Sequence, residues 1–196
     1  MDTYSWAILA GAVILALVIG AAVAWLIIRR RHARQLRQKF GREYDHAVEK
    51  TGSKRQAETE LQRREERVRQ FDIRPLPAQQ RAAYRDSWRQ VQANFVDAPV
   101  RAVAEADELV TEVMQKRGYP MGDFEQRTED LSVDHPVVVE NYRAAHDIAL
   151  RSDRGQADTE DLRQAMVHYR VLFEDLLEET TTDGRMKERK MEGEVR

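Results

Sequence analysis

The chain has 196 residues, of which 34% are charged and 42% hydrophobic, and its formal net charge is −2. This length suits one domain of ordinary size together with an anchor, so a second full domain is not expected. The absence of cysteine excludes disulfides, thiolate metal sites and cysteine nucleophiles, and the scarcity of Gly and Pro predicts an all-α fold.

The first strong feature is an uncharged, apolar run at residues 5–28. A helix rises about 1.5 Å per residue, so this run would span roughly 36 Å and exceed the ~30 Å hydrocarbon core of a bilayer. A cleaved signal peptide is the alternative, but it would begin with basic residues and have a shorter apolar core, whereas residues 1–4 contain Asp2 and no Lys or Arg. The run predicts a single transmembrane helix, with residues 1–4 as an external N-terminus.

Four arginines follow the apolar run, namely Arg29, Arg30, Arg31 and Arg34. Basic residues beside a membrane span are retained on its cytoplasmic side. We therefore expect the N-terminus outside and the rest of the chain in the cytoplasm. The same arginines can also hold the chain against anionic headgroups, at about 1 kcal/mol per well-placed charge.

The charge of the remaining chain divides into two parts. Residues 29–70 include 14 basic and 7 acidic residues, a net of +7, whereas residues 71–179 include 13 basic and 22 acidic residues, a net of −9. This division predicts a basic helical stalk at residues 29–73 and an acidic helical domain, the body, at residues 74–179. Residues 180–196 lack apolar periodicity and are predicted to be a disordered tail.

The stalk is predicted to contain two helices separated at Thr51-Gly52, with Ser53 and Gln56 as a capping box at the start of the second. The run Arg63-Arg64-Glu65-Glu66-Arg67 predicts a solvated helix face rather than a nucleic-acid patch. The pattern leaves open whether the stalk extends as a rod or folds back onto the body. Its apolar stripes comprise Leu36, Phe40, Tyr44 and Ala47 in the first helix, and Ala57, Leu61, Val68 and Phe71 in the second.

The body should form a bundle of helices after the break at Arg74-Pro75-Leu76-Pro77, where each proline removes a backbone donor. Further breaks are expected near Pro99 and Gly118, and a short helical stretch at residues 124–131. Pro136 is expected at the first position of a helix, and Asp158 or Thr159 at the cap of the last one. Residues with helical spacing predict the core: Tyr84, Trp88, Val91, Phe95, Val103, Ala106, Val110, Val113, Val139, Tyr142, His146, Ala149, Leu162, Ala165, Tyr169, Leu172 and Leu176.

Several short motifs lie in the block from Trp88 to Leu177: Phe95-Val96-Asp97, Ala106-Asp107, Arg117-Gly118-Tyr119-Pro120, Asp134-His135-Pro136, Tyr142-Arg143-Ala144-Ala145-His146, His168-Tyr169-Arg170 and Leu172-Phe173. With these motifs the block resembles a bacterial family of uncharacterised single-pass, membrane-anchored helical proteins. The segment Phe40-Gly41-Arg42-Glu43-Tyr44-Asp45 resembles the juxtamembrane segment of the same family. That family has no known activity or cofactor, so the resemblance implies only the architecture and a location in the inner (plasma) membrane of a bacterium.

Candidate chemistry in the sequence is sparse. Di-iron bundles use two Glu-x-x-His pairs, but Glu43 and His46 form the only such pair here. Three body histidines, His135, His146 and His168, offer a general base if the fold brings them to Asp134, Asp147 or Glu174. Their positions are equally compatible with caps and with polar residues beside a core. We therefore predict no catalytic, cofactor or metal site.

These features favour a membrane-anchored protein-interaction or scaffolding module that is not an enzyme. Two alternatives remain: a tethered enzyme that uses the body histidines and carboxylates, or a structural membrane protein that self-associates through its span and stalk. The expected partners are the bilayer, through residues 5–28, anionic headgroups at the stalk, and an unidentified protein. Nucleic acid is not expected, because the basic charge lies beside the membrane and the body is acidic.

Overall fold

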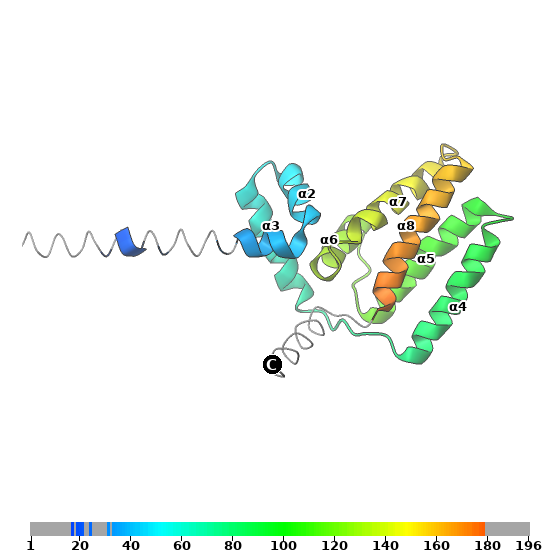
Figure 1. Ribbon diagram of the computed structural model, residues 1–196, viewed down its shortest axis with the longest axis horizontal. Helices are drawn as coiled ribbons and strands as arrows, with labels where there is room; N and C mark the ends of the chain where they lie inside the picture. The colour runs from blue at the N-terminus through cyan, green and yellow to red at the C-terminus, as the bar shows by residue number, and fades with distance from the viewer. Residues whose placement is uncertain (1–16, 18, 22–23, 25–30, 32, 179–196) are drawn as a thin grey trace, which may run out of the picture.

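The computed structural model describes residues 17, 19–21, 24, 31 and 33–178, and every regular element among them is a helix (Figure 1). The all-α prediction is therefore confirmed. The predicted membrane span at 5–28 lies outside the described residues apart from 17, 19–21 and 24, and the predicted tail at 180–196 lies wholly outside them. Within the described residues, no helix has both the length and the apolar character needed to cross a bilayer.

The N-terminal part of the described chain folds as a helical hairpin. Residues 33–40 are helical, Gly41 turns the chain at a φ of 53°, and α2 (Arg42–Thr51) and α3 (Lys54–Val68) follow. Gly52 ends α2 in the left-handed conformation that favours glycine, which confirms the predicted break. Ser53 lies at the N-cap of α3, but its side chain makes no capping hydrogen bond, so the predicted capping box is wrong.

The body contains α4 (Ala78–Asn94), α5 (Pro99–Arg117), α6 (Phe124–Asp134), α7 (Val139–Asp153) and α8 (Thr159–Leu177). α8 packs against both α5 and α7, and α4 packs on α5 at the end of the body farthest from the hairpin (Figure 1). Asp158 caps α8 through a capping box with Asp161, one of the two caps expected there. The predicted break before Ala78 is also present, because α4 begins directly after Pro77.

One predicted helix start is wrong. Pro136 was expected at the first position of a helix, but α7 begins at Val139. α6 continues to Asp134, and the backbone N–H of His135 donates to the Leu131 carbonyl at 2.8 Å. The chain then turns, with the Val138 N–H donating back to the His135 carbonyl at 3.2 Å. Extension of α6 by three residues beyond the predicted end thus uses the residues that were expected to cap α7.

The hairpin folds back onto the body, which answers the question that the sequence left open. Its core comprises the predicted apolar stripes and includes Val133 of α6, which is 5% exposed. Ile73, in the connection between α3 and α4, packs against both the hairpin core and the body core. The predicted stalk is therefore attached to the body through side chains of α3 and α6 rather than held away from it.

A buried carboxylate joins the hairpin to the body. Glu43 of α2 is fully buried and accepts hydrogen bonds from Arg64 Nη1 at 2.8 Å and from Arg143 Nη1 and Nη2 at 2.6 and 3.0 Å. Arg143 belongs to α7 and lies one hundred residues from Glu43 in the sequence. It donates to the Glu43 carboxylate through both terminal guanidinium nitrogens, a bidentate ion pair. Two arginines thus surround one buried negative charge.

Arg64 continues this network towards α6. Its guanidinium contacts Glu129 at 3.2 Å and Ser132 at 3.4 Å, and its side chain is 1% exposed. Arg67 binds Asp130 at 2.7 Å and Glu129 at 3.3 Å. The predicted solvated face at residues 63–67 is therefore wrong for Arg64, because this arginine points into the contact between hairpin and body. The opposite charges of stalk and body meet here.

Candidate functional site

The structure places few of the predicted membrane-flanking arginines. Arg29 and Arg30 lie outside the described residues, while Arg31 and Arg34 are exposed on helical backbone. Their predicted roles in orientation and in headgroup binding stay predictions.

The Glu43-His46 pair does not form half of a metal site. Glu43 is enclosed by Arg64 and Arg143, and these two cations occupy the carboxylate that a metal would need. Across the described part of the chain, no three His, Asp or Glu side chains are grouped in a way that could hold a metal ion. The spacing that suggested a ligand instead reflects a buried structural carboxylate.

Two of the body histidines bind side chains of a neighbouring helix. His135, at the turn after α6, contacts the carboxylate of Asp175 on α8 through Nδ1 and is 6% exposed. His168 of α8 contacts Asn141 Oδ1 of α7 at 2.8 Å through its Nδ1. Each histidine thus connects two helices, which is the structural role that the sequence allowed.

The third histidine, His146 of α7, stacks on Phe124 of α6 with ring centroids 3.6 Å apart. Burial lowers its pKa below the usual 6.5, and the charge of Arg127 lowers it further, whereas the carboxylate of Asp107 opposes the shift. The imidazole is therefore neutral at pH 7. Asp107 in turn accepts a hydrogen bond from the Tyr169 hydroxyl at 2.9 Å.

The carboxylates considered as partners of these histidines are bound elsewhere. Arginines pair with two of them, and a tyrosine hydroxyl donates to the third. Asp175, which does contact a histidine, was not identified from the sequence, because a pair forty residues apart leaves no spacing signal. The contacts are Asp134 with Tyr119 at 3.3 Å, Asp147 with Arg151 at 3.4 Å, and Glu174 with Arg170 at 2.7 Å.

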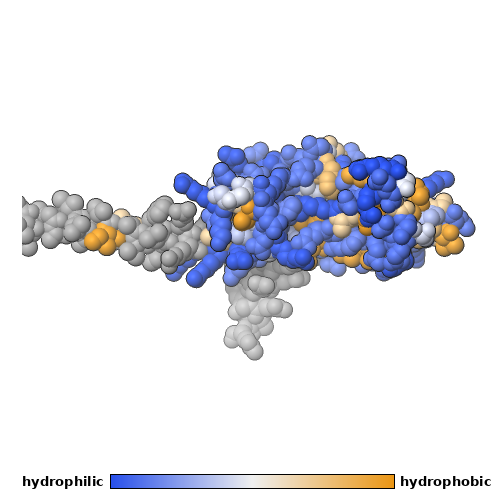
Figure 2. Space-filling model, turned by 90° about the horizontal axis from the view of Figure 1, so that it is seen from above, coloured by the Kyte–Doolittle hydropathy of each residue, from blue (hydrophilic) through white to orange (hydrophobic). Residues whose placement is uncertain are grey.

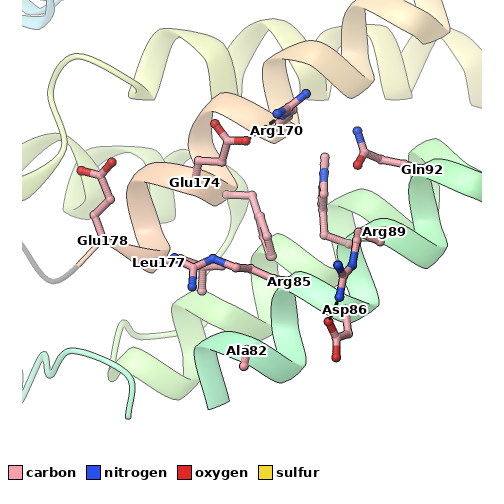
Figure 3. Close-up of a pocket in the computed structure, with 11 residues that line it drawn as sticks. Ala82, Arg85, Asp86, Arg89, Gln92, Arg170, Glu174, Leu177 and Glu178 are labelled. Atoms are coloured by element: carbon pink, nitrogen blue, oxygen red, sulfur yellow. Dashed lines mark hydrogen bonds and ion pairs between the residues drawn. The ribbon is translucent and has the colours of Figure 1, made fainter. Parts of the chain in front are cut away.

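A groove lies between α4 and α8 of the body. α4 and α8 both pack against α5 and leave a hollow of about 610 Å³ between them. Figure 3 shows side chains of both helices around this hollow, with Arg85 extending from α4 towards Leu177 at the end of α8. We refer to it as the α4–α8 groove. Its lining residues are Ala82, Arg85, Asp86, Trp88, Arg89, Gln92, Arg170, Phe173, Glu174, Leu177 and Glu178.

Two stacked aromatic rings form the floor of the α4–α8 groove. Trp88 and Phe173 lie with ring centroids 4.7 Å apart and an interplanar angle of 21°. Trp88 is 5% exposed, and its indole N–H has no acceptor in the described chain. A buried donor without an acceptor costs stability.

Charged side chains form the rim. Arg89 pairs with Asp86 on α4, and Arg170 pairs with Glu174 on α8. All four side chains are more than half exposed, so each ion pair contributes at most about 1 kcal/mol to the stability of the fold. Each arginine can therefore leave its present carboxylate and bind that of another molecule. Arg85 makes no ion pair within the described chain.

The groove continues beyond its largest hollow. A second hollow of about 190 Å³ shares Gln92 and Arg170 with the first, and it adds Phe95 of α4 and Met166 and Val167 of α8. Figure 2 shows a largely hydrophilic surface over the hairpin and apolar side chains at the far end of the body. Val96 and Val100, beside the end of α4, are 83% and 55% exposed.

The helical spacing predicted Trp88 to be a core residue and gave no sign of a groove. That assignment is correct for burial, since Trp88 packs within the body core. Helical spacing in the sequence does not show, however, that α4 and α8 both pack against α5 and leave a space between them. The available signal was the arginine spacing beside Trp88, with Arg81, Arg85 and Arg89 at four-residue intervals on one edge of a helix.

Comparison with known proteins adds no family to this description. No family model matches the chain, and neither curated proteins nor solved structures give a significant match. The resemblance of residues 88–177 to a bacterial family of membrane-anchored proteins therefore stays a prediction.

Proposed function

We propose that this protein is a membrane-anchored docking module that holds a partner protein in the α4–α8 groove. The single observation that carries the proposal is the groove itself, with its aromatic floor and its rim of exchangeable ion pairs. Protein-binding sites are enriched in buried aromatic anchors and arginine, the two residue types that dominate this groove. The arrangement suits recognition of a partner rather than chemical transformation of a substrate.

The anchor in this proposal is residues 5–28, which place the body at the cytoplasmic face of a bacterial inner membrane. The supporting features are the uncharged run of 24 residues and the arginines that follow it. The charge network fastens the hairpin, which follows the anchor in the sequence, to the body that contains the groove. A partner held in the groove would keep a fixed position relative to the hairpin.

A topology experiment tests the anchor. A fluorescent reporter that matures only in the cytoplasm, fused to the C-terminus, is expected to fluoresce in the membrane fraction at the full-length mass. Replacement of Arg29, Arg30, Arg31 and Arg34 by glutamine should reduce that fluorescence, because the orienting charge is lost. A periplasmic signal from the unmodified chain, or a shortened product, would contradict the proposed orientation.

Site-specific photocrosslinking tests the docking site. A photoreactive residue at Ala82 or Gln92, both exposed and lining the groove, is expected to give an adduct of one discrete mass in intact cells. Ala83 and Gln90 are matched controls, since they are exposed on the same helix but do not line the groove. Equal adducts from all four positions would contradict docking in the groove. An adduct of twice the chain mass would favour self-association instead.

A further inference from the structure

The α4–α8 groove has the form that an amphipathic helix requires. Apolar side chains follow its floor, from Leu177 and Phe173 at one end to Met166 and Phe95 at the other. α4 has 17 residues and so provides a wall of roughly 26 Å, or between four and five helical turns. A helix that lies in such a groove inserts residues at i, i+3, i+4 and i+7, which covers a continuous apolar strip of this kind.

The net charge of α4 indicates which charge the polar face of a bound helix should have. α4 contains three arginines and one aspartate, and it is the only helix among α4–α8 with more basic than acidic residues. Arg85 has no ion pair in the described chain, and Arg89 pairs only with Asp86 one turn away. On the opposite wall, Arg163 and Arg170 pair with exposed glutamates of their own helix, contacts that a partner carboxylate can replace. The lining of the two hollows includes four arginines and three carboxylates, a net charge of +1 in an otherwise acidic body.

The position of the groove favours a protein over a lipid surface. Figure 1 shows α4 at the opposite end of the molecule from α2 and α3. The hairpin continues directly from the segment that follows the predicted anchor, so its end of the molecule is the one next to the bilayer. In the proposed arrangement α4 and its arginines therefore lie at the end of the molecule away from the headgroups.

We propose that the α4–α8 groove binds an acidic amphipathic helix of a partner protein. The apolar stripe of that helix covers Trp88 and Phe173, and its carboxylates pair with Arg85, Arg89 and Arg170. This inference rests on the proposed docking function and specifies the chemistry of the partner.

Synthetic peptides test the inference on the full chain in detergent. Three fluorescent 16-residue peptides have the same leucines at i, i+3, i+4 and i+7, and their polar positions are all Glu, all Gln or all Lys. A fourth peptide has the composition of the Glu peptide with the leucines scrambled. We expect the Glu peptide to bind at least tenfold more tightly than the Gln peptide, and the Lys and scrambled peptides to bind more weakly still. Added salt should reduce the difference.

A charge reversal separates specific pairing from general attraction. The Arg85→Glu variant is expected to lose at least tenfold in affinity for the Glu peptide and to gain affinity for the Lys peptide. Arg154→Glu is the matched control, because Arg154 is exposed in the connection between α7 and α8, outside the groove. If both variants lose the same affinity, the net charge of the protein and not the groove governs binding, and the inference is overturned.

The outcomes distinguish this inference from the docking function on which it rests. If Ala82 and Gln92 give adducts in cells but the Glu and Lys peptides bind equally, the groove docks a protein and the acidic helix is wrong. If neither adducts nor peptide binding are observed, both proposals fail. Displacement of the Glu peptide by phosphatidylglycerol vesicles, but not by phosphatidylcholine vesicles, would show an anionic lipid surface as the occupant and would also overturn the inference.

Discussion

Replacement of Glu43 by alanine is expected to destabilise the folded chain by about 3–5 kcal/mol, the usual cost of removing one partner from a buried ion pair. The substitution leaves Arg64, which is 1% exposed, without its closest carboxylate, and it frees both nitrogens of Arg143. A cation left in a site of low dielectric has no water to solvate it. Urea unfolding of the full chain in mild detergent, followed by far-ultraviolet circular dichroism, measures this change.

Asp45 provides the matched control for Glu43 on the same helix. Its carboxylate lies 3.5 Å from Arg37, and the two side chains are 59% and 66% exposed. Exposed pairs of this kind contribute roughly 0–1 kcal/mol, so Asp45→Ala should change the free energy of unfolding by no more than that. Equal losses in the two variants would show that Glu43 acts through the helix rather than through its arginines.

The hairpin contains one feature that the sequence predicts, its apolar stripe, and one that it does not, the pairing of Glu43 with the body. A helical period needs only neighbouring residues, so the stripe of Leu36, Phe40, Tyr44 and Ala47 was identified correctly, and all four side chains are buried. The pairing of Glu43 with Arg143 joins residues one hundred positions apart and produces no local pattern. For this reason Glu43 was first considered with His46, its neighbour on the same helix.

The burial of Arg64 in the contact between hairpin and body is also not predictable from neighbouring residues. In the sequence Arg64 belongs to a charged run that is typical of a solvated helix face, and its four neighbours in that run have the same appearance. Its burial depends on where α6 lies, because Glu129 and Ser132 of α6 receive its guanidinium. The net charges of +7 and −9 distinguished the stalk from the body, but they did not indicate whether the two are in contact or through which residues.

The α4–α8 groove could be predicted only in part, for a geometric reason. Spacing placed Trp88 on an inward face, and Trp88 is indeed buried in the body core, where it stacks on Phe173. Whether two such faces meet or leave a hollow depends on how each helix leans on α5, and this angle is not a property of either helix alone. Exposed ion pairs along the rim then distinguish a binding groove from an ordinary core.

Replacement of Gly118 by alanine is expected to cost about 2–4 kcal/mol, from backbone strain together with a steric clash. Gly118 ends α5 at a φ of 99°, a conformation that residues with a Cβ rarely adopt. An added Cβ would lie 2.4 Å from the carbonyl oxygen of Asp72, so the connection between hairpin and body would have to move. That movement would break the hydrogen bond from the Arg74 N–H to the Arg117 carbonyl, now 2.8 Å long.

Replacement of Gly155 by alanine separates the backbone strain at Gly118 from the steric clash with Asp72. The φ of Gly155 is 69°, but no atom lies within 4 Å of the position that a Cβ would take. Gly155→Ala should therefore show only the cost of a left-handed backbone, about 1–2 kcal/mol, in the same urea unfolding experiment. A larger loss for Gly118→Ala indicates that the connection at residues 72–74 is fastened to the end of α5, and so helps to fix the hairpin against the body. Equal losses would mean that this connection moves freely and that the buried charges around Glu43 hold the two parts together without it.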